Sequence, residues 1–242
     1  MNHKAYNILI TLIVSIGGLL LGISAMISGA SEIYRPYFGL TVGSFLEGLA
    51  VSAAMAGTVI GNLFAGIISD KLGRKKALFI AAFLCCFFTL GSGLAINYSF
   101  LIVSRFIGGF GIGISLLVAP LFIAEFSPSE KRGFLVSFNQ LNIGIGYLLA
   151  YFLNTLVLKF FPDPEITWRW MFGIGFVFPV VYILLLFLVP ESPRWLITRG
   201  RDTEAKKIMD RVGGKEYIKK EFTEIKAAVE SDAKREKPSF GV

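Results

Sequence analysis

The chain has 242 residues, of which 54% are hydrophobic and only 17% are charged, and its formal net charge is +7. Soluble domains carry roughly 25% charged residues, so this composition excludes an ordinary soluble protein and indicates a chain that folds in a membrane. His3 is the only histidine, and the adjacent Cys85 and Cys86 suit packing in an apolar helix. We therefore expect no enzyme, no metal and no cofactor.

Six stretches without a charged residue follow one another along the chain, and each is at least 19 residues long. A bilayer core is crossed by roughly 20 helical residues, and a backbone in lipid must satisfy its hydrogen bonds internally. We predict an all-α, polytopic membrane protein with a six-helix transmembrane domain at 1–190. The expected spans are 7–30, 46–69, 77–96, 99–124, 133–158 and 168–190.

The first span has a second interpretation. His3 and Lys4 precede it, and Ser28-Gly29-Ala30 could imitate a signal-peptide cleavage site. The apolar region of a signal peptide has roughly 7–15 residues, which is shorter than this run. Five further spans follow, so a retained first helix is the simpler prediction.

Basic residues are distributed unevenly between the loops. Twenty of the 24 Lys and Arg residues lie before the first span, in the second-to-third and fourth-to-fifth loops, or after Pro190. The alternate loops hold three, namely Arg35, Lys159 and Arg169. The positive-inside rule then predicts a multi-pass protein of the plasma or inner membrane with both termini in the cytoplasm.

Small residues recur at every fourth position of the second span, at Ala53, Gly57, Gly61 and Ala65. The fourth span carries Gly109 and Gly113 in "RFIGGFGIG". Such stripes predict helices whose backbones approach closely in the membrane.

Arg105 begins the fourth span. A cation inside a membrane costs several kcal/mol unless it is paired or solvated, so it indicates a functional site. Alternatively, Arg105 lies at the interface and its side chain reaches the headgroups. The first, third, fifth and sixth runs contain no carboxylate, and the sequence does not show what neutralises this charge.

The fifth span is the most polar. Gln140, Gly144, Tyr147, Tyr151 and Asn154 are three or four residues apart and so share one helix face. One interpretation is hydrogen bonding between helices, which is common in membrane proteins. The other is one wall of a polar cavity that binds a neutral, hydroxyl-rich solute. The residues alone leave both open.

The tail at 191–242 changes character. Asp202 can cap a helix that Gly213-Gly214 ends, and a second amphipathic helix is expected at about 215–231. The balanced charge of this tail argues against nucleic-acid binding. We predict cytoplasmic helices that cover the inner mouth of the membrane domain or lie on the membrane surface.

Several motifs then occur in a recognisable order. "GIISDKLGRKKALF" (66–79) resembles the loop between the second and third helices of the major facilitator superfamily. "PLFIAEFSPSEKRG" (120–133), "FNQLNIGIG", "WRWMFG" and "PESPRWL" (190–196) resemble motifs of its sugar porter family. Each motif is weak alone, but together they cover nearly the whole chain.

The resemblance implies a transporter in which a solute binds between two six-helix halves, each made of inverted three-helix repeats. It also implies a cytoplasmic ion-pair latch that holds the halves together in the outward-facing state. Plain anchoring by positive charge explains the cations but gives the carboxylates no role. The implied latch residues are Asp70, Arg74, Glu125, Arg132, Glu191 and Arg194.

The resemblance also assigns a solute site. Gln140 matches a sugar-contacting glutamine of the family, and Tyr147 stands where many relatives have a second glutamine. With Tyr151 and Asn154 these form the predicted substrate-binding set for a sugar or polyol. The first-helix acid of proton-coupled sugar porters is missing here, so facilitated diffusion is favoured over proton symport.

A whole transporter of this family has six more helices. We therefore expect this chain to be the amino-terminal half and to act with a carboxy-terminal six-helix half. Two other functions stay open. One is a non-transporting membrane scaffold or regulator, and the other is a transporter half for a small organic anion, which Arg105 would favour.

Overall fold

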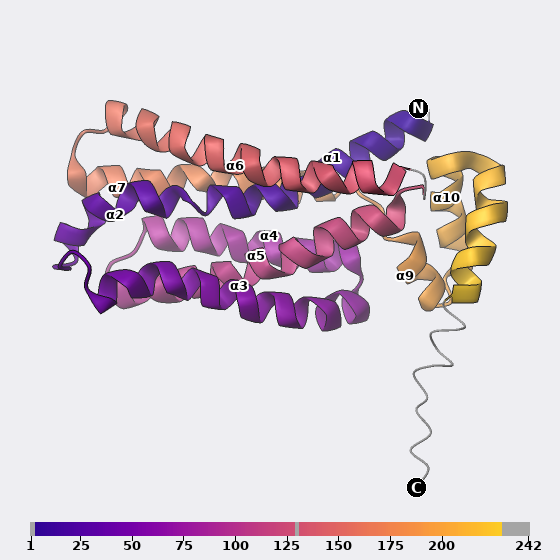
Figure 1. Ribbon diagram of the computed structural model, residues 1–242, viewed down its shortest axis with the longest axis horizontal. Coiled ribbons are helices and arrows are strands. Elements are labelled where there is room, and N and C mark those ends of the chain that lie inside the picture. The colour runs from indigo at the N-terminus through magenta and orange to yellow at the C-terminus, as the bar shows by residue number, and fades with distance from the viewer. Residues whose placement is uncertain (1–2, 129–130, 229–242) are drawn as a thin grey trace, which may run out of the picture.

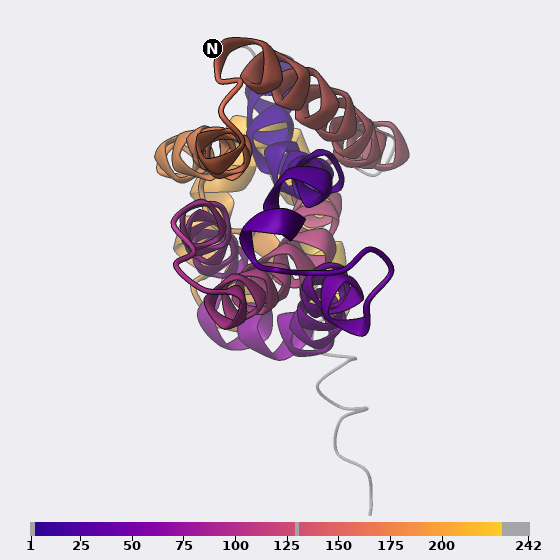
Figure 2. The same ribbon diagram turned by 90° about the vertical axis from the view of Figure 1, so that its left-hand side faces the viewer.

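The computed structural model describes residues 3–128 and 131–228, and every regular element in these ranges is helical. Six helical segments are long and apolar enough to cross a membrane, as predicted. They lie side by side along the long axis of the molecule (Figure 1) and form one bundle when seen end-on (Figure 2). The segments are α1 (His3–Ile23), α3 (Phe45–Leu72), α4 (Arg74–Gly93), α5 (Tyr98–Phe126), α6 (Arg132–Phe160) and the run Pro164–Leu186.

The first crossing differs from the single helix expected at 7–30. Helix α1 ends at Ile23, and α2 (Met26–Tyr37) follows after a turn at Ser24 and Ala25. The hydroxyl of Ser24 donates to the carbonyl oxygen of Leu21 at 2.6 Å, a local bond that competes with helical pairing and bends helices. A charge-free run cannot reveal such a break, because both pieces are apolar.

The sixth crossing is also divided. It consists of α7 (Pro164–Gly173), a 3₁₀ turn (Ile174–Phe176) and α8 (Val177–Leu186). It begins four residues before the expected start at 168, because Asp163 caps it through a bond from the amide of Glu165, and Pro164 occupies the first helical position.

Helices α3 and α5 are in backbone contact. A Cβ atom added to Gly57 of α3 would overlap the carbonyl oxygen of Phe106 on α5, so no side chain fits between the two helices there. The other glycines of the two predicted stripes meet the facing backbone in the same way, which confirms the predicted close approach. These are Gly61, Gly109 and Gly113.

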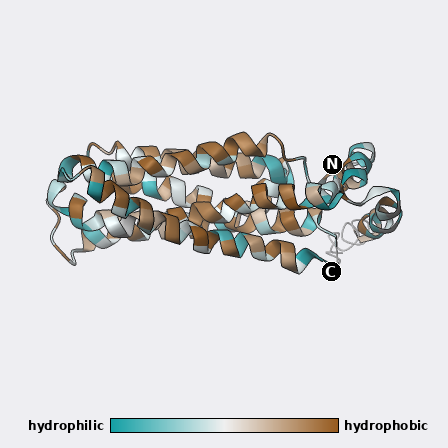
Figure 3. Cartoon of the chain, turned by 90° about the horizontal axis from the view of Figure 1, so that it is seen from above, coloured by the Kyte–Doolittle hydropathy of each residue, from teal (hydrophilic) through white to brown (hydrophobic). Residues whose placement is uncertain are grey.

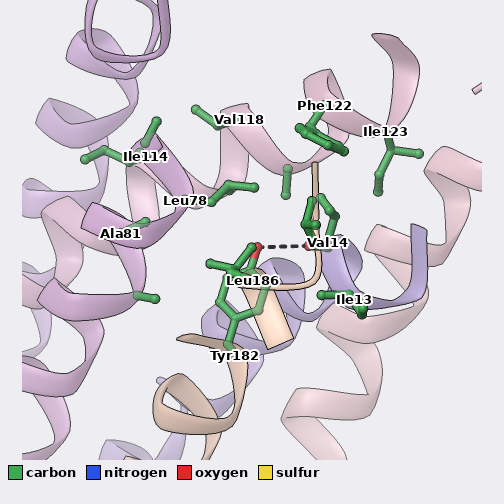
Figure 4. Packing of buried hydrophobic residues seen from close by; sticks show 14 of the residues in the cluster. Ile13, Val14, Leu78, Ala81, Ile114, Val118, Phe122, Ile123, Tyr182 and Leu186 are labelled. Atoms are coloured by element: carbon green, nitrogen blue, oxygen red, sulfur yellow. Dashed lines mark hydrogen bonds between the residues drawn. The ribbon is translucent and has the colours of Figure 1, made fainter. Parts of the chain in front are cut away.

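Buried apolar side chains of α1, α4, α5 and α8 fill the bundle next to this contact (Figure 4). Tyr182 of α8 is fully buried in this cluster, and its hydroxyl donates to the carbonyl oxygen of Val14 at 3.2 Å. The outer surface is apolar as well: Leu148 is 72% exposed and Leu184 is 62% exposed. Hydrophilic residues gather at the two ends of the bundle (Figure 3), as lipid around its middle requires.

The end formed by α2 and α7 is held by Arg169. Its guanidinium donates to the carbonyl oxygens of Gly93 and Ala95, both at 3.1 Å, where α4 has just ended. It also stacks on Trp168, with 4.3 Å between the guanidinium carbon and the ring centroid. A cation at a helix C-terminus stabilises the carbonyl groups left without partners there.

The tail forms α9 (Pro193–Thr198), α10 (Asp202–Tyr217) and a π-helical turn (Ile218–Phe222) at the other end, beside the start of α1 (Figure 1). The backbone leaves helical geometry at Gly214, with φ of +77°, where the sequence predicted the first tail helix to stop. Side chains of α1 bond the carbonyl groups before this bend: His3 Nδ1 lies 3.0 Å from the oxygen of Arg211, and Asn7 donates to that of Val212. Residues 229–231 of the second expected helix lie outside the described ranges.

The contact between α3 and α5 predicts opposite effects for two glycines of α3. Gly61→Ala should destabilise the protein by about 2 kcal/mol, because its methyl group would force the two backbones apart. Gly66→Ala should be neutral or stabilising by up to about 1 kcal/mol, because nothing lies within 4 Å of the added atom. Unfolding of the purified variants in detergent measures both, and equal stabilities would contradict the contact.

Candidate functional site

A groove of about 450 Å³ opens between α1, α3, α5 and α6. Apolar residues form most of its wall. Its polar lining residues are Ser24, Thr58, Arg105, Tyr147 and Tyr151. Its volume suits a small solute.

The structure divides the polar face of α6 that the sequence predicted. Tyr147 and Tyr151 line the groove, and they are 41% and 54% exposed. Gln140 is exposed too, but it lies outside this lining, roughly 10 Å before Tyr147 along the helix. Asn154 is buried instead, and its amide donates to the carbonyl oxygen of Met26 at 2.9 Å.

Asn154 therefore makes the bond between helices that the alternative interpretation expected. The amide of Asn142, on the same helix, donates to the hydroxyl of Ser15 on α1 at 2.7 Å. Sequence reasoning missed Ser24 and Thr58 as groove residues, because single hydroxyls in apolar spans usually bond their own helix. Thr58 does so, donating to the carbonyl oxygen of Ala54 at 2.8 Å.

Arg105 lines the groove and is 2% exposed, so its side chain is packed inside the bundle. It is seven residues into α5, about two turns from the start. Its Nε donates to the carbonyl oxygen of Ala50 at 2.6 Å, and the rings of Phe88 and Phe172 flank the guanidinium. Within the described ranges Nη1 has no hydrogen-bond partner, and no ion pair to this residue is found.

Arg74 is the centre of a charged cluster at the tail end of the bundle. Two of its nitrogens donate to the two carboxylate oxygens of Glu125, each at 2.9 Å, and a third donates to Asp70 at 2.9 Å. The Arg74 and Glu125 side chains are only 11% and 6% exposed, whereas that of Asp70 is 69% exposed. A paired fork of this kind is among the strongest hydrogen-bonded contacts in proteins.

Glu191 joins this cluster through backbone amides. Its carboxylate accepts bonds from the amide of Lys75 at 3.0 Å and from that of Ser192 at 2.9 Å. Lys75 is the second residue of α4, so Glu191 places a negative charge at the positive end of that helix. Burial raises the pKa of the Glu191 carboxyl, and these amide bonds act in the opposite direction.

Residues after Glu191 bind the end of α3 and were missed in the sequence. The indole nitrogen of Trp195 donates to the carbonyl oxygen of Asp70 at 2.9 Å, and Arg199 donates to the same oxygen at 2.7 Å. The hydroxyl of Ser192 donates to Glu125 at 2.6 Å. These contacts attach the tail to the α3–α4 loop, and only the folded tail brings them together.

Arg132 and Arg194 complete the predicted latch set. Both are exposed, and both line one shallow pocket of about 120 Å³ together with Glu125. The bonds found for Glu125 come from Arg74 and Ser192. All six predicted latch residues therefore lie at the same end of the bundle, and the ion pairs of Arg74 are formed within this chain.

A family model for "Sugar (and other) transporter" matches residues 10–241. The chain belongs to this family. The putative metabolite transport protein YwtG of Bacillus subtilis is 39% identical over 230 residues, which are 95% of this chain and 49% of that protein. Probable inositol transporter 2 of Arabidopsis thaliana is 39% identical over 90% of this chain and 37% of that protein.

The fold agrees with a solved member of the superfamily. The proton:xylose symporter XylE of E. coli, bound to 6-bromo-6-deoxy-D-glucose, superposes with a TM-score of 0.91 at 32% identity. The match covers 96% of this chain and 55% of that one. The chain thus spans about half the length, or less, of the relatives it matches, and its six membrane helices have the major facilitator arrangement.

The exposure of the two acids that bind Arg74 predicts unequal roles. Glu125→Gln should destabilise the protein by about 3 kcal/mol, because it leaves the mostly buried Arg74 without its main counter-charge. Asp70→Asn should cost at most about 1 kcal/mol, because that pair is exposed to solvent. Denaturant unfolding measures both, and a double-mutant cycle with Arg74→Gln isolates each pair. Equal losses for the two acids would refute this ranking.

Proposed function

We propose that this chain forms one half of a transporter that moves a sugar or polyol across the membrane by alternating access. The observation that carries the proposal is the open groove between four membrane helices in a chain of this family. Relatives named for inositol and xylose support a hydroxyl-rich solute. We further propose that the groove meets a carboxy-terminal six-helix half and that both termini face the cytoplasm of a plasma or inner membrane.

The lining favours such a solute on physical grounds. Tyr147, Tyr151 and Thr58 supply uncharged hydroxyl groups, and the surrounding apolar residues exclude water. We assign Gln140 a contact further along the pathway. Asn154 then acts as a positioning residue that fixes the start of α2 against α6.

The charged cluster serves as the conformational latch in this proposal. The Arg74–Glu125 pair is mostly buried and holds α4 against α5 throughout the cycle, while the exposed contacts around it are weak enough to break. Arg132 is an exposed member of the cluster that faces solvent at this end of the bundle.

Arg105 supports a second candidate. A buried cation that lines the groove without an ion pair among the described residues also suits a small organic anion. An anion would lose much of its binding in Arg105→Gln and little in Tyr147→Phe, whereas a sugar should respond in the opposite order.

Site-directed labelling tests the solute site. Gly144 is exposed on α6 between Gln140 and Tyr147, and a side chain there meets nothing within 4 Å. In a Cys86→Ser background, a saturating concentration of xylose or myo-inositol should slow maleimide labelling of Gly144→Cys several-fold, because the bound solute covers the site.

Gly133→Cys, equally open at the start of the same helix, is the matched control and should label at an unchanged rate. Protection by succinate but by no sugar would show that the solute is a small organic anion. No protection by any solute, and no uptake on co-expression with the carboxy-terminal half of a relative, would refute transport.

We propose facilitated diffusion as the mode of coupling. Some relatives are named as proton symporters, so this point needs its own test. A symporter needs a titratable group that gains and loses its proton with the solute, and within the part of the chain that the structure describes no carboxylate is bonded to Arg105. Uptake by the reconstituted pair of halves should equilibrate the sugar and should not respond to an imposed proton gradient. Accumulation driven by that gradient would contradict this assignment.

A further inference from the structure

A second cavity, of about 440 Å³, lies at the tail end of the bundle and plays no part in the proposed transport. It is formed where α1 and α6 begin and where α10 reaches its bend at Val212 and Gly213. Both helices are long and apolar enough to cross a membrane, and a cavity at their ends would then lie at the level of the lipid headgroups. Among the described residues, its polar and charged lining residues are His3, Lys4, Asn7 and Lys131.

The electrostatics of this cavity favour an anion. Lys4 and Lys131 line it, and α1 and α6 both start beside it without an acidic residue in the first turn. Helix N-termini carry partial positive charge and unpaired amides, so two of them add to the field of the lysines.

Asn7 adds a more specific requirement. It is 8% exposed, and its amide nitrogen donates to the carbonyl oxygen of Val212 at 3.0 Å. Its Oδ1 has no hydrogen-bond partner among the described residues. A buried acceptor without a partner is unfavourable, so an occupant of this cavity that carries a donor such as a hydroxyl group is favoured.

The remaining wall is apolar and continues into the membrane. Ile8 is 47% exposed and Phe134 is 68% exposed. Leu12 lies one turn beyond Ile8 and is exposed, as is Leu141, two turns beyond Phe134. An occupant with long apolar chains could therefore lie along both helices.

We propose that this cavity binds an anionic phospholipid whose headgroup carries a hydroxyl group, of the phosphatidylglycerol type. Its phosphate lies near Lys4 and Lys131, its headgroup hydroxyl donates to Asn7 Oδ1, and its acyl chains follow α1 and α6. Because Val212 and Gly213 form part of the wall, the bound lipid also holds the tail helices against the bundle. This inference does not depend on the solute that is transported.

Native mass spectrometry of the full chain in detergent tests the proposal by titration with three lipids of equal chain length. Phosphatidylglycerol should bind more tightly than phosphatidylcholine because of its net charge. It should also bind more tightly than phosphatidylmethanol, which has the same charge but no headgroup hydroxyl. Lys131→Gln should weaken the binding of phosphatidylglycerol about fivefold, since a basic residue near anionic lipid contributes about that factor to the affinity.

Lys76→Gln is the matched control, because Lys76 is exposed at the same end of the bundle but does not line the cavity. Equal losses in the two variants would overturn the proposal in favour of diffuse attraction between basic residues and anionic lipid. Equal binding of all three lipids would overturn it by showing that the headgroup is not recognised. Competition by glycerol 3-phosphate as strong as that by the lipid would overturn it in favour of a free phosphate.

Discussion

Close approach of helix backbones holds this bundle together, because lipid offers an apolar side chain the same surroundings as a neighbouring helix does. Dispersion contacts then replace the hydrophobic effect, and they require small residues at the crossing points. Gly57 and Gly61 let α3 lie directly on α5, and Gly22 and Gly146 do the same for α1 and α6. The groove lies between these four helices, so its shape depends on how closely they cross.

The tail end is organised by a different force. Between α3 and α4 the chain turns at Gly73, with φ of +97°, and leaves one helix C-terminus beside one helix N-terminus. Glu191 binds the amide of Lys75 at the N-terminus, and Arg199 and Trp195 bind carbonyl oxygens at the C-terminus. Each charge thus meets the helix end of opposite sign. The tail is in this way part of the membrane domain's structure.

Much of this was predictable from the sequence, for a physical reason. A charge within lipid is costly, so charge-free runs indicated where the six candidate crossings lie. The stripes of glycine and alanine located the contact between α3 and α5. Helical periodicity also grouped Asn154 with Tyr147 and Tyr151 as solute-binding residues. Periodicity was insufficient to predict which of the three side chains line the groove. It defines a face of one helix but does not show which neighbour covers part of that face, and α2 covers Asn154. The bonds of Ser192 and Trp195 depend on the three-dimensional path of the tail.

The turn at Ser24 and Ala25 divides the first crossing into pieces with different neighbours. The first piece, α1, packs chiefly on α5 and α6, and the second piece, α2, packs chiefly on α7, where Tyr37 bonds Arg169. A tilt of α2 and α7 relative to the other helices needs new dihedral angles at this joint and at the 3₁₀ turn Ile174–Phe176, and it breaks the bonds that join Arg169 to α4 and Asn154 to α2. Both interruptions lie between helices, so the hydrogen bonds within α1 and α2 and the glycine crossings are not part of the joints.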